Sequence, residues 1–135
     1  MTRAAIAVRH NIEVAHRLHL LPGKCQAIHG HSMWVRLELG GGLDRGGLLD
    51  GLDFSAVKRA FRGYLDEFYD HRLLLDTDDP VTAGNLPGLR MTEGQPTTEN
   101  LARWIAEWSA ERFACATGGR VTVRETHVNE ASWAW

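Results

Sequence analysis

Residues 6–16, IAVRHNIEVAH, and residues 29–39, HGHSMWVRLEL, alternate apolar with polar side chains along their length. A period of two is typical of a β-strand with one buried face. A turn at Leu21-Pro22-Gly23 separates the two stretches, so we expect them to pair antiparallel. The residues expected on the buried face are Ile6, Val8, His10, Ile12, Val14 and His16 in the first strand, and His29, His31, Met33, Val35, Leu37 and Leu39 in the second.

Three histidines of these strands are expected to meet at one point. His16 ends the first strand and His29 and His31 begin the second, so antiparallel pairing places all three at the same end of the buried face. Burying three neutral imidazoles together contributes little stability by itself. When the same three bind a zinc ion, they leave a fourth coordination position for water or substrate. The sequence therefore predicts a catalytic zinc site. The alternative is three separate polar residues at strand ends.

Length and composition indicate a single domain over residues 1–135. With 44% hydrophobic residues and five Trp, the chain can bury one core and is short for two. The net charge of -2 argues against nucleic acid as a partner. The sequence shows no apolar signal segment and no apolar run of the roughly 20 residues that span a bilayer, so we expect a cytoplasmic protein without a membrane partner. Cys25 and Cys115 have unlike neighbours, which favours reduced thiols.

Further along the chain, the periodicity changes between two and 3.6 residues and gives the order β-β-β-α-α-β-β. The expected elements are a third strand around 48–52, a helix over 54–69, an irregular connection over 76–95, a helix beginning at 96–99, and strands over 121–127 and 131–135. Asp53 is a candidate cap of the first helix, and the connection is a candidate substrate lid or subunit contact. This order excludes a Rossmann-type fold and predicts an antiparallel sheet covered by two helices. The open edges of such a sheet favour a homo-oligomer.

Several motifs now stand in a fixed order along nearly the whole chain. They are His16, Cys25-Gln-Ala-Ile-His29-Gly-His31, Asp70-His71, Pro96-Thr97-Thr98-Glu99-Asn100-Leu101 and Glu125-Thr126. This set resembles the 6-pyruvoyltetrahydropterin synthase superfamily. The cysteine four residues before the first histidine of the HxH pair is most similar to the bacterial members of the queuosine pathway, which make 6-carboxytetrahydropterin.

The resemblance implies an α+β tunnelling fold (T-fold). Such a fold has an antiparallel sheet of about four main strands, with two helices packed on one face, and it oligomerises into a barrel. A homo-oligomer, with a hexamer favoured, would carry active sites at its subunit interfaces. The implied function is that of a zinc-dependent lyase, which converts 7,8-dihydroneopterin triphosphate to 6-carboxy-5,6,7,8-tetrahydropterin with loss of triphosphate and acetaldehyde.

Carried over residue by residue, the resemblance implies a role for each motif. The implied roles are zinc ligands for His16, His29 and His31, the catalytic base for Cys25, proton return for Asp70 and His71, pterin binding for Glu125 assisted by Thr126, and secondary substrate contacts for Thr97 and Thr98.

Simpler interpretations stay open for several of these residues. Cys25 could be a fourth ligand of a closed structural metal site. His71 could be an ordinary histidine after a helix, and Glu125 could pair with Arg124 on the surface. Thr97 and Thr98 are explained by helix capping alone. The remaining histidines, His10, His19 and His127, are expected to be hydrogen-bonded core histidines.

The chain also departs from the family pattern at two places. Asp50-Gly51 interrupts the apolar run before Phe54, which predicts a β-bulge, and the segment 77–95 is longer than in the compact bacterial enzyme. The function could therefore be that of a 6-pyruvoyltetrahydropterin synthase or a pathway-specific pterin or deazapurine relative. An alternative of another class is a non-catalytic pterin-binding or assembly subunit that keeps the metal for stability.

Overall fold

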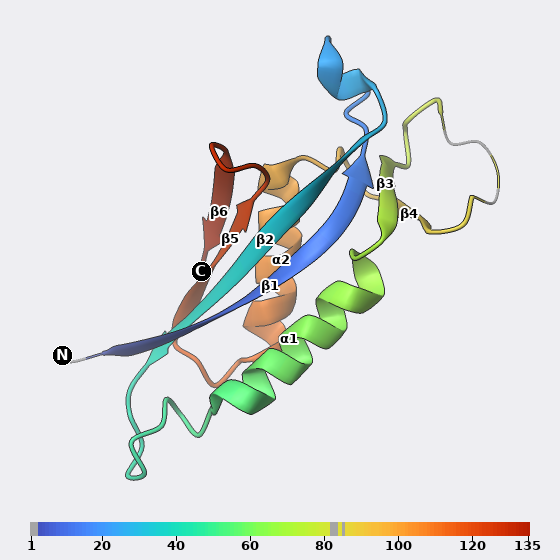
Figure 1. Ribbon diagram of the computed structural model, residues 1–135. Coiled ribbons are helices and arrows are strands. Elements are labelled where there is room, and N and C mark those ends of the chain that lie inside the picture. The colour runs from blue at the N-terminus through green and yellow to red at the C-terminus, as the bar shows by residue number, and fades with distance from the viewer. Residues whose placement is uncertain (1–2, 82–83, 85) are drawn as a thin grey trace.

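Two long strands form the centre of a six-stranded sheet, and two helices cover one of its faces (Figure 1). The computed structural model describes residues 3–81, 84 and 86–135. Across the sheet the strand order is β4-β3-β1-β2-β5-β6. The elements are β1 (Ala4–His16), a 3-10 turn η1 (Lys24–Gln26), β2 (His29–Gly41), α1 (Phe54–Phe68), β3 (Arg72–Asp76), β4 (Leu89–Thr92), α2 (Thr98–Arg112), β5 (Gly118–Arg124) and β6 (Glu130–Ala134).

The central pair has the register that the alternation predicts. β1 and β2 run antiparallel, with His16 opposite His29 and Val14 opposite His31. Because side chains alternate between faces, this register puts the three histidines on the face that the helices cover. The antiparallel ladder continues through β5 and β6, and these four strands are the main strands of the predicted T-fold.

The core lies between this face of the sheet and the helices. Ile12, Met33 and Val35 of the sheet are fully buried, as are Phe61 of α1 and Ile105 of α2. Both helices begin at a residue whose side chain accepts a hydrogen bond from a backbone amide, because the first amides of a helix have no partner within it. These N-caps are Asp53, which bonds the Ala56 amide, and Thr97, which bonds the Asn100 amide. Neither described helix has the length and apolar character required to cross a membrane.

The third strand predicted around residues 48–52 is wrong. Leu49 makes only isolated bridges to Leu43 and Leu52, and the chain turns at Asp50 and Gly51, which have φ of 45° and 75°. Left-handed backbone at two successive residues is incompatible with an extended strand. The Asp50-Gly51 interruption is therefore a turn and not the predicted β-bulge. Leu49 is still buried in the core.

The segment predicted to be an irregular connection contains a strand. Residues 89–92 form β4, which runs parallel to β3, and β3 runs parallel to the end of β1. The sheet is therefore mixed, with a parallel part beside the four antiparallel strands. β3 and β4 were missed because they are short and the Leu73–Leu75 run does not alternate. The predicted substrate lid or subunit contact falls partly on residues 82, 83 and 85, which lie outside the described residues.

Candidate metal centre and active site

Three imidazoles converge where β1 ends and β2 begins. The Nε2 atoms of His16 and His29 are 3.1 Å apart, and one ring nitrogen from each of His16, His29 and His31 lies within 4.8 Å of the others. Two nitrogens on one tetrahedral zinc ion are separated by roughly 3.3 Å, given Zn–N bonds of about 2.0–2.1 Å. The spacing of the triad therefore fits a shared metal ion.

Hydrogen bonds to backbone carbonyls orient two of the three rings. The carbonyl oxygens of Pro96 and Ala27 lie 2.7 Å from Nδ1 of His16 and of His29, so each Nδ1 donates and each Nε2 stays free to bind a metal. Nε2 of His31 is buried and has no hydrogen-bond partner. Burial lowers the pKa of His16, His29 lowers it further, and the bond to Pro96 opposes the shift. His16 is therefore neutral at pH 7, which is the form that binds metals.

Cys25 lies beside this triad in sequence but is not part of the ligand cluster. Within the described residues, the group that could share a metal ion consists of the three histidines alone. Cys25 sits in η1, is partly buried, and has a free thiol, as has Cys115. A closed site with Cys25 as fourth ligand is therefore disfavoured, and a metal ion held by the three histidines would keep one position open.

Glu125 is brought to the triad from the end of β5. Its Oε1 lies 3.5 Å from Nε2 of His31 and 3.6 Å from Nε2 of His16, and its side chain is 19% exposed. Its neighbour Arg124 instead donates to the backbone carbonyls of Thr126 and His127. Glu125 is thus not half of a surface pair with Arg124. It is a carboxylate beside the histidine triad.

The three threonines have different surroundings. Thr97 caps α2, and the hydroxyl of Thr126 accepts the amides that close the β5–β6 turn, so both hydroxyls are engaged in local structure. Thr98 borders a polar cavity of about 360 Å³ between the start of α2 and the β5–β6 turn, together with Glu99 and Glu125. Among the three threonines, Thr98 shares this cavity with Glu125.

Asp70 and His71 follow α1 and form a bonded pair. Asp70 Oδ2 accepts from Nδ1 of His71 at 2.8 Å, and Oδ1 accepts from the Glu13 amide at 2.7 Å. Burial raises the pKa of the Asp70 carboxyl, but the Glu13 amide and His71 outweigh it, so the pKa lies below its usual range. The His71 side chain is 78% exposed and borders an open groove of about 490 Å³ that also reaches His31. No hydrogen bond or ion pair links the pair to the triad within the part of the chain that the structure describes.

The other histidines differ from the expectation. His10 bonds Asp66 of α1 at 2.6 Å but is only partly buried, and His127 is exposed, so neither is a core histidine. His19 is nearly buried, with its Nδ1 unbonded and near Asp76 and Asp79. Sequence reasoning assigned no role to these two aspartates, because the acidic run was interpreted as part of a connection.

Comparison with known proteins identifies the family. Residues 5–134 match the 6-pyruvoyl tetrahydropterin synthase family. The chain is 29% identical over 100 residues to the 6-carboxy-5,6,7,8-tetrahydropterin synthase of Rickettsia felis, covering 70% of this chain and 71% of the relative. It is 33% identical over 94 residues to a probable 6-carboxy-5,6,7,8-tetrahydropterin synthase of Halobacterium salinarum, covering 65% of this chain and 57% of that one.

Solved structures show the same fold. The 6-pyruvoyl tetrahydropterin synthase of Plasmodium falciparum superposes with a TM-score of 0.83 at 18% identity, over 100% of this chain and 99% of that chain. An uncharacterized protein of Wolinella succinogenes gives a TM-score of 0.80 at 22% identity, over 98% of each chain. These likenesses confirm the T-fold predicted from the motifs. Together with the match over residues 5–134, they show that the chain belongs to the 6-pyruvoyl tetrahydropterin synthase family.

Proposed function

We propose that this protein is a zinc-dependent lyase that converts 7,8-dihydroneopterin triphosphate to 6-carboxy-5,6,7,8-tetrahydropterin, releasing triphosphate and acetaldehyde. The observation that carries the proposal is the histidine triad, in which the buried Nε2 atom of His31 lacks a hydrogen-bond partner among the described residues. Family membership and the names of the relatives support the substrate class. The free thiols of Cys25 and Cys115 are compatible with the reducing cytoplasm that we propose as its location.

His16, His29 and His31 would hold the metal, since their free nitrogens form the only such cluster in the described ranges. When bound, zinc would act as a Lewis acid toward the hydroxyl oxygens of the substrate side chain and make the neighbouring C–H bonds more acidic. The carbonyls of Pro96 and Ala27 keep two of the rings in the tautomer that this role requires.

The other polar residues would bind the pterin and move protons. We assign Cys25 the removal of a proton from the substrate side chain. Glu125 would accept two N–H donors from the aminopyrimidine edge, and Thr98 borders the same cavity. The Asp70 carboxylate orients His71, whose other ring nitrogen would return a proton.

We propose that the site is completed where copies of the chain meet, with a hexamer favoured. The His71 side chain is largely exposed, and a relay of this kind works best when water is excluded from it. The outer strands β4 and β6 are also unpaired on one side within the described chain, and pairing or covering such edges is a common role of a second copy.

The experiment is to incubate the zinc-loaded protein with 7,8-dihydroneopterin triphosphate and identify the products by mass spectrometry. The expected products are 6-carboxytetrahydropterin, triphosphate and acetaldehyde. A pyruvoyl product without acetaldehyde would instead indicate a 6-pyruvoyltetrahydropterin synthase. Cys25→Ala should keep zinc and lose turnover, while His29→Ala should lose both. Unchanged substrate, under conditions in which a control enzyme turns over, would favour the non-catalytic pterin-binding subunit.

A further inference from the structure

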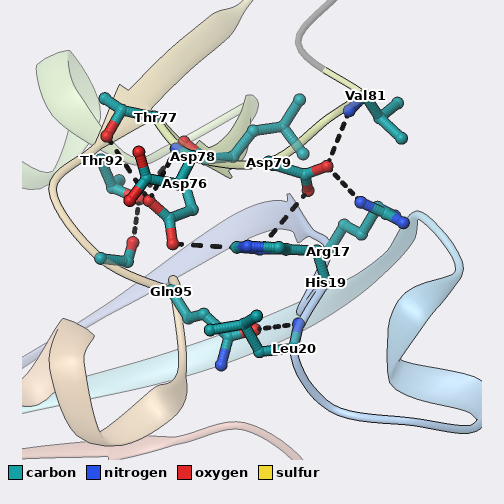
Figure 2. A network of polar contacts seen from close by, with 12 residues as sticks. Arg17, His19, Leu20, Asp76, Thr77, Asp78, Asp79, Val81, Thr92 and Gln95 are labelled. Carbon is teal, nitrogen blue, oxygen red and sulfur yellow. Dashed lines mark hydrogen bonds and ion pairs between the residues drawn. The ribbon is translucent and has the colours of Figure 1, made fainter.

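A second buried polar cluster lies outside the triad, where the segment after β1 meets the end of β3 and the residues that follow it (Figure 2). It consists of Arg17, His19, Asp76 and Asp79. The side chain of Asp79 is fully buried, and those of Asp76 and His19 are 6% and 9% exposed. Burying a carboxylate is costly unless it is paired, so a cluster of this kind constrains the segments that supply it.

Arg17 connects this cluster to the residues around Cys25. Its guanidinium donates from Nη1 to Asp79 Oδ1 and from Nε to the backbone carbonyl of Gln26 at 2.7 Å. The neighbouring backbone continues the connection, because the Leu18 amide donates to the Cys25 carbonyl at 2.9 Å. The residue that follows the metal ligand His16 thus holds one neighbour of Cys25 through a single planar group.

Asp79 is itself a fixed anchor. Its Oδ1 also accepts the Val81 amide at 2.8 Å, and its own amide donates to the Asp76 carbonyl at 2.9 Å. Burial raises the pKa of the Asp79 carboxyl, but the Val81 amide, Arg17 and His19 outweigh it and keep the group ionised. The charge of Arg17 therefore has a buried, hydrogen-bonded partner that is ionised at neutral pH, unlike the partners of most surface arginines.

His19 supports the anchor from the other side. Figure 2 shows its ring between the two carboxylates, with Nδ1 at 3.9 Å from Asp76 Oδ2 and 4.0 Å from Asp79 Oδ2. The His19 carbonyl accepts from the Gln26 side chain at 3.2 Å, and the Leu20 amide donates to Gln95 at 2.8 Å. The loop is therefore tied both to itself and to the segment that precedes α2.

We propose that Asp79, acting through Arg17, is a positioning residue for Cys25, and that this is the role of the acidic segment 76–79. The ion pair sets where the Lys24–Gln26 turn lies relative to His16, the metal ligand that precedes Arg17 in the chain. This inference rests on the proposed function only in assigning Cys25 a part in the reaction. The placement of Cys25 itself can be measured without substrate.

The test uses Asp79→Ala and Arg17→Lys in the zinc-loaded full chain. We expect kcat to fall by about 10- to 100-fold with KM little changed, because a displacement of about 1 Å near the reacting atoms can cost about 100-fold. Lysine keeps the charge but cannot supply the two donors of the planar fork, so Arg17→Lys should behave like Asp79→Ala. The double variant should have a kcat no lower than that of either single variant, because both substitutions disrupt the same Arg17–Asp79 interaction.

The position of Cys25 can also be measured without substrate. Iodoacetamide labelling of Cys25, read by peptide mass spectrometry, should become several-fold faster in both variants as the turn loosens. The second cysteine of the chain, Cys115, is exposed and serves as the internal reference, whose rate should not change. The matched control is Asp78→Ala, which removes an exposed carboxylate beside Asp79, and Asp66→Asn controls for the loss of a remote ion pair with His10.

Three results would overturn the proposal. They are unchanged Cys25 labelling and kcat in Asp79→Ala, an equal effect of Asp78→Ala, and loss of zinc in step with loss of kcat, which would place the effect at the metal ligands. If Asp79→Ala does not fold, Asp79→Asn keeps an oxygen for Arg17 and the Val81 amide and should show a smaller change in the same direction. If the unmodified protein has no activity, the proposed function fails, while the labelling rates still decide the placement of Cys25.

Discussion

Replacing His31 with alanine should change stability little in metal-free protein and should remove most of the stabilisation that zinc provides. In metal-free protein, Nε2 of His31 is buried without a hydrogen-bond partner among the described residues, and such a group costs on the order of 1–3 kcal/mol. His31→Ala removes this cost together with the packing of a ring that is 19% exposed. We therefore expect the metal-free variant to lie within about 1 kcal/mol of metal-free wild type.

With zinc present, only the unmodified triad should gain stability. Zinc at 100 times its Kd stabilises the folded state by about 2.7 kcal/mol, because it binds the folded state selectively. For 135 residues, an unfolding entropy of about 2.1 cal/mol/K per residue converts this into a rise in Tm of about 10 °C. His31→Ala should lose most of that rise, since two imidazoles hold zinc much more weakly than three.

The assay is thermal unfolding, followed by circular dichroism, of chelator-treated protein before and after titration with zinc. His127→Ala is the matched control, because it removes an exposed histidine and should keep the full zinc-dependent rise. The reasoning is refuted if zinc raises Tm equally in wild type and His31→Ala. It is also refuted if wild type shows no rise at zinc concentrations that saturate a chelating dye.

Three further predictions concern other parts of the chain. Asp79 has a lowered pKa in the folded state, so its contribution is present above the unfolded pKa of about 3.9 and is lost as pH falls through the lower folded value. In urea titrations of metal-free protein, the stability difference between wild type and Asp79→Asn should therefore shrink below about pH 4, and a constant difference would contradict this. Gly119→Ala would place a Cβ against the Trp135 ring and should cost about 1–3 kcal/mol in thermal melts, whereas Gly42→Ala enters open space and should cost little. Glu125→Gln should raise KM for the pterin substrate by about tenfold or more at unchanged zinc content, since hydrogen bonds to a charged group contribute about 1.5–3 kcal/mol, and an unchanged KM would remove Glu125 from pterin binding.

The centre of the sheet and the convergence of the three histidines could be predicted because strand periodicity carries long-range information. Once residues 6–16 and 29–39 are known to alternate and to pair, the face of every side chain in them follows. The pairing of these two strands alone therefore predicts that His16 lies opposite His29. Glu125 was placed by the same rule, because it continues the alternation of Val121 and Val123 beyond β5.

The parts that could not be predicted are those whose partners lie far apart and outside periodic segments. β3 and β4 have five and four residues, too few for a period to show, and their parallel pairing depends on a crossover rather than a hairpin. The contact of Arg17 with Asp79 spans 62 residues. Nothing in the local sequence of either residue indicates the other, so the acidic segment resembled a solvated connection.

The same distinction separates the identity of the proposed metal ligands from their orientation. Strand alternation selects His16, His29 and His31, but it does not decide which ring nitrogen faces the centre. For His16 and His29 that choice is made by two backbone carbonyls, those of Pro96 and Ala27, which lie in irregular segments before α2 and before β2. Because a carbonyl oxygen depends on backbone path and not on side-chain identity, substitutions that shift these segments should weaken metal binding even with the three histidines intact. The orientation of the imidazoles therefore depends on loops whose path the sequence patterns do not predict. The sheet that carries the imidazoles is the part that those patterns do predict.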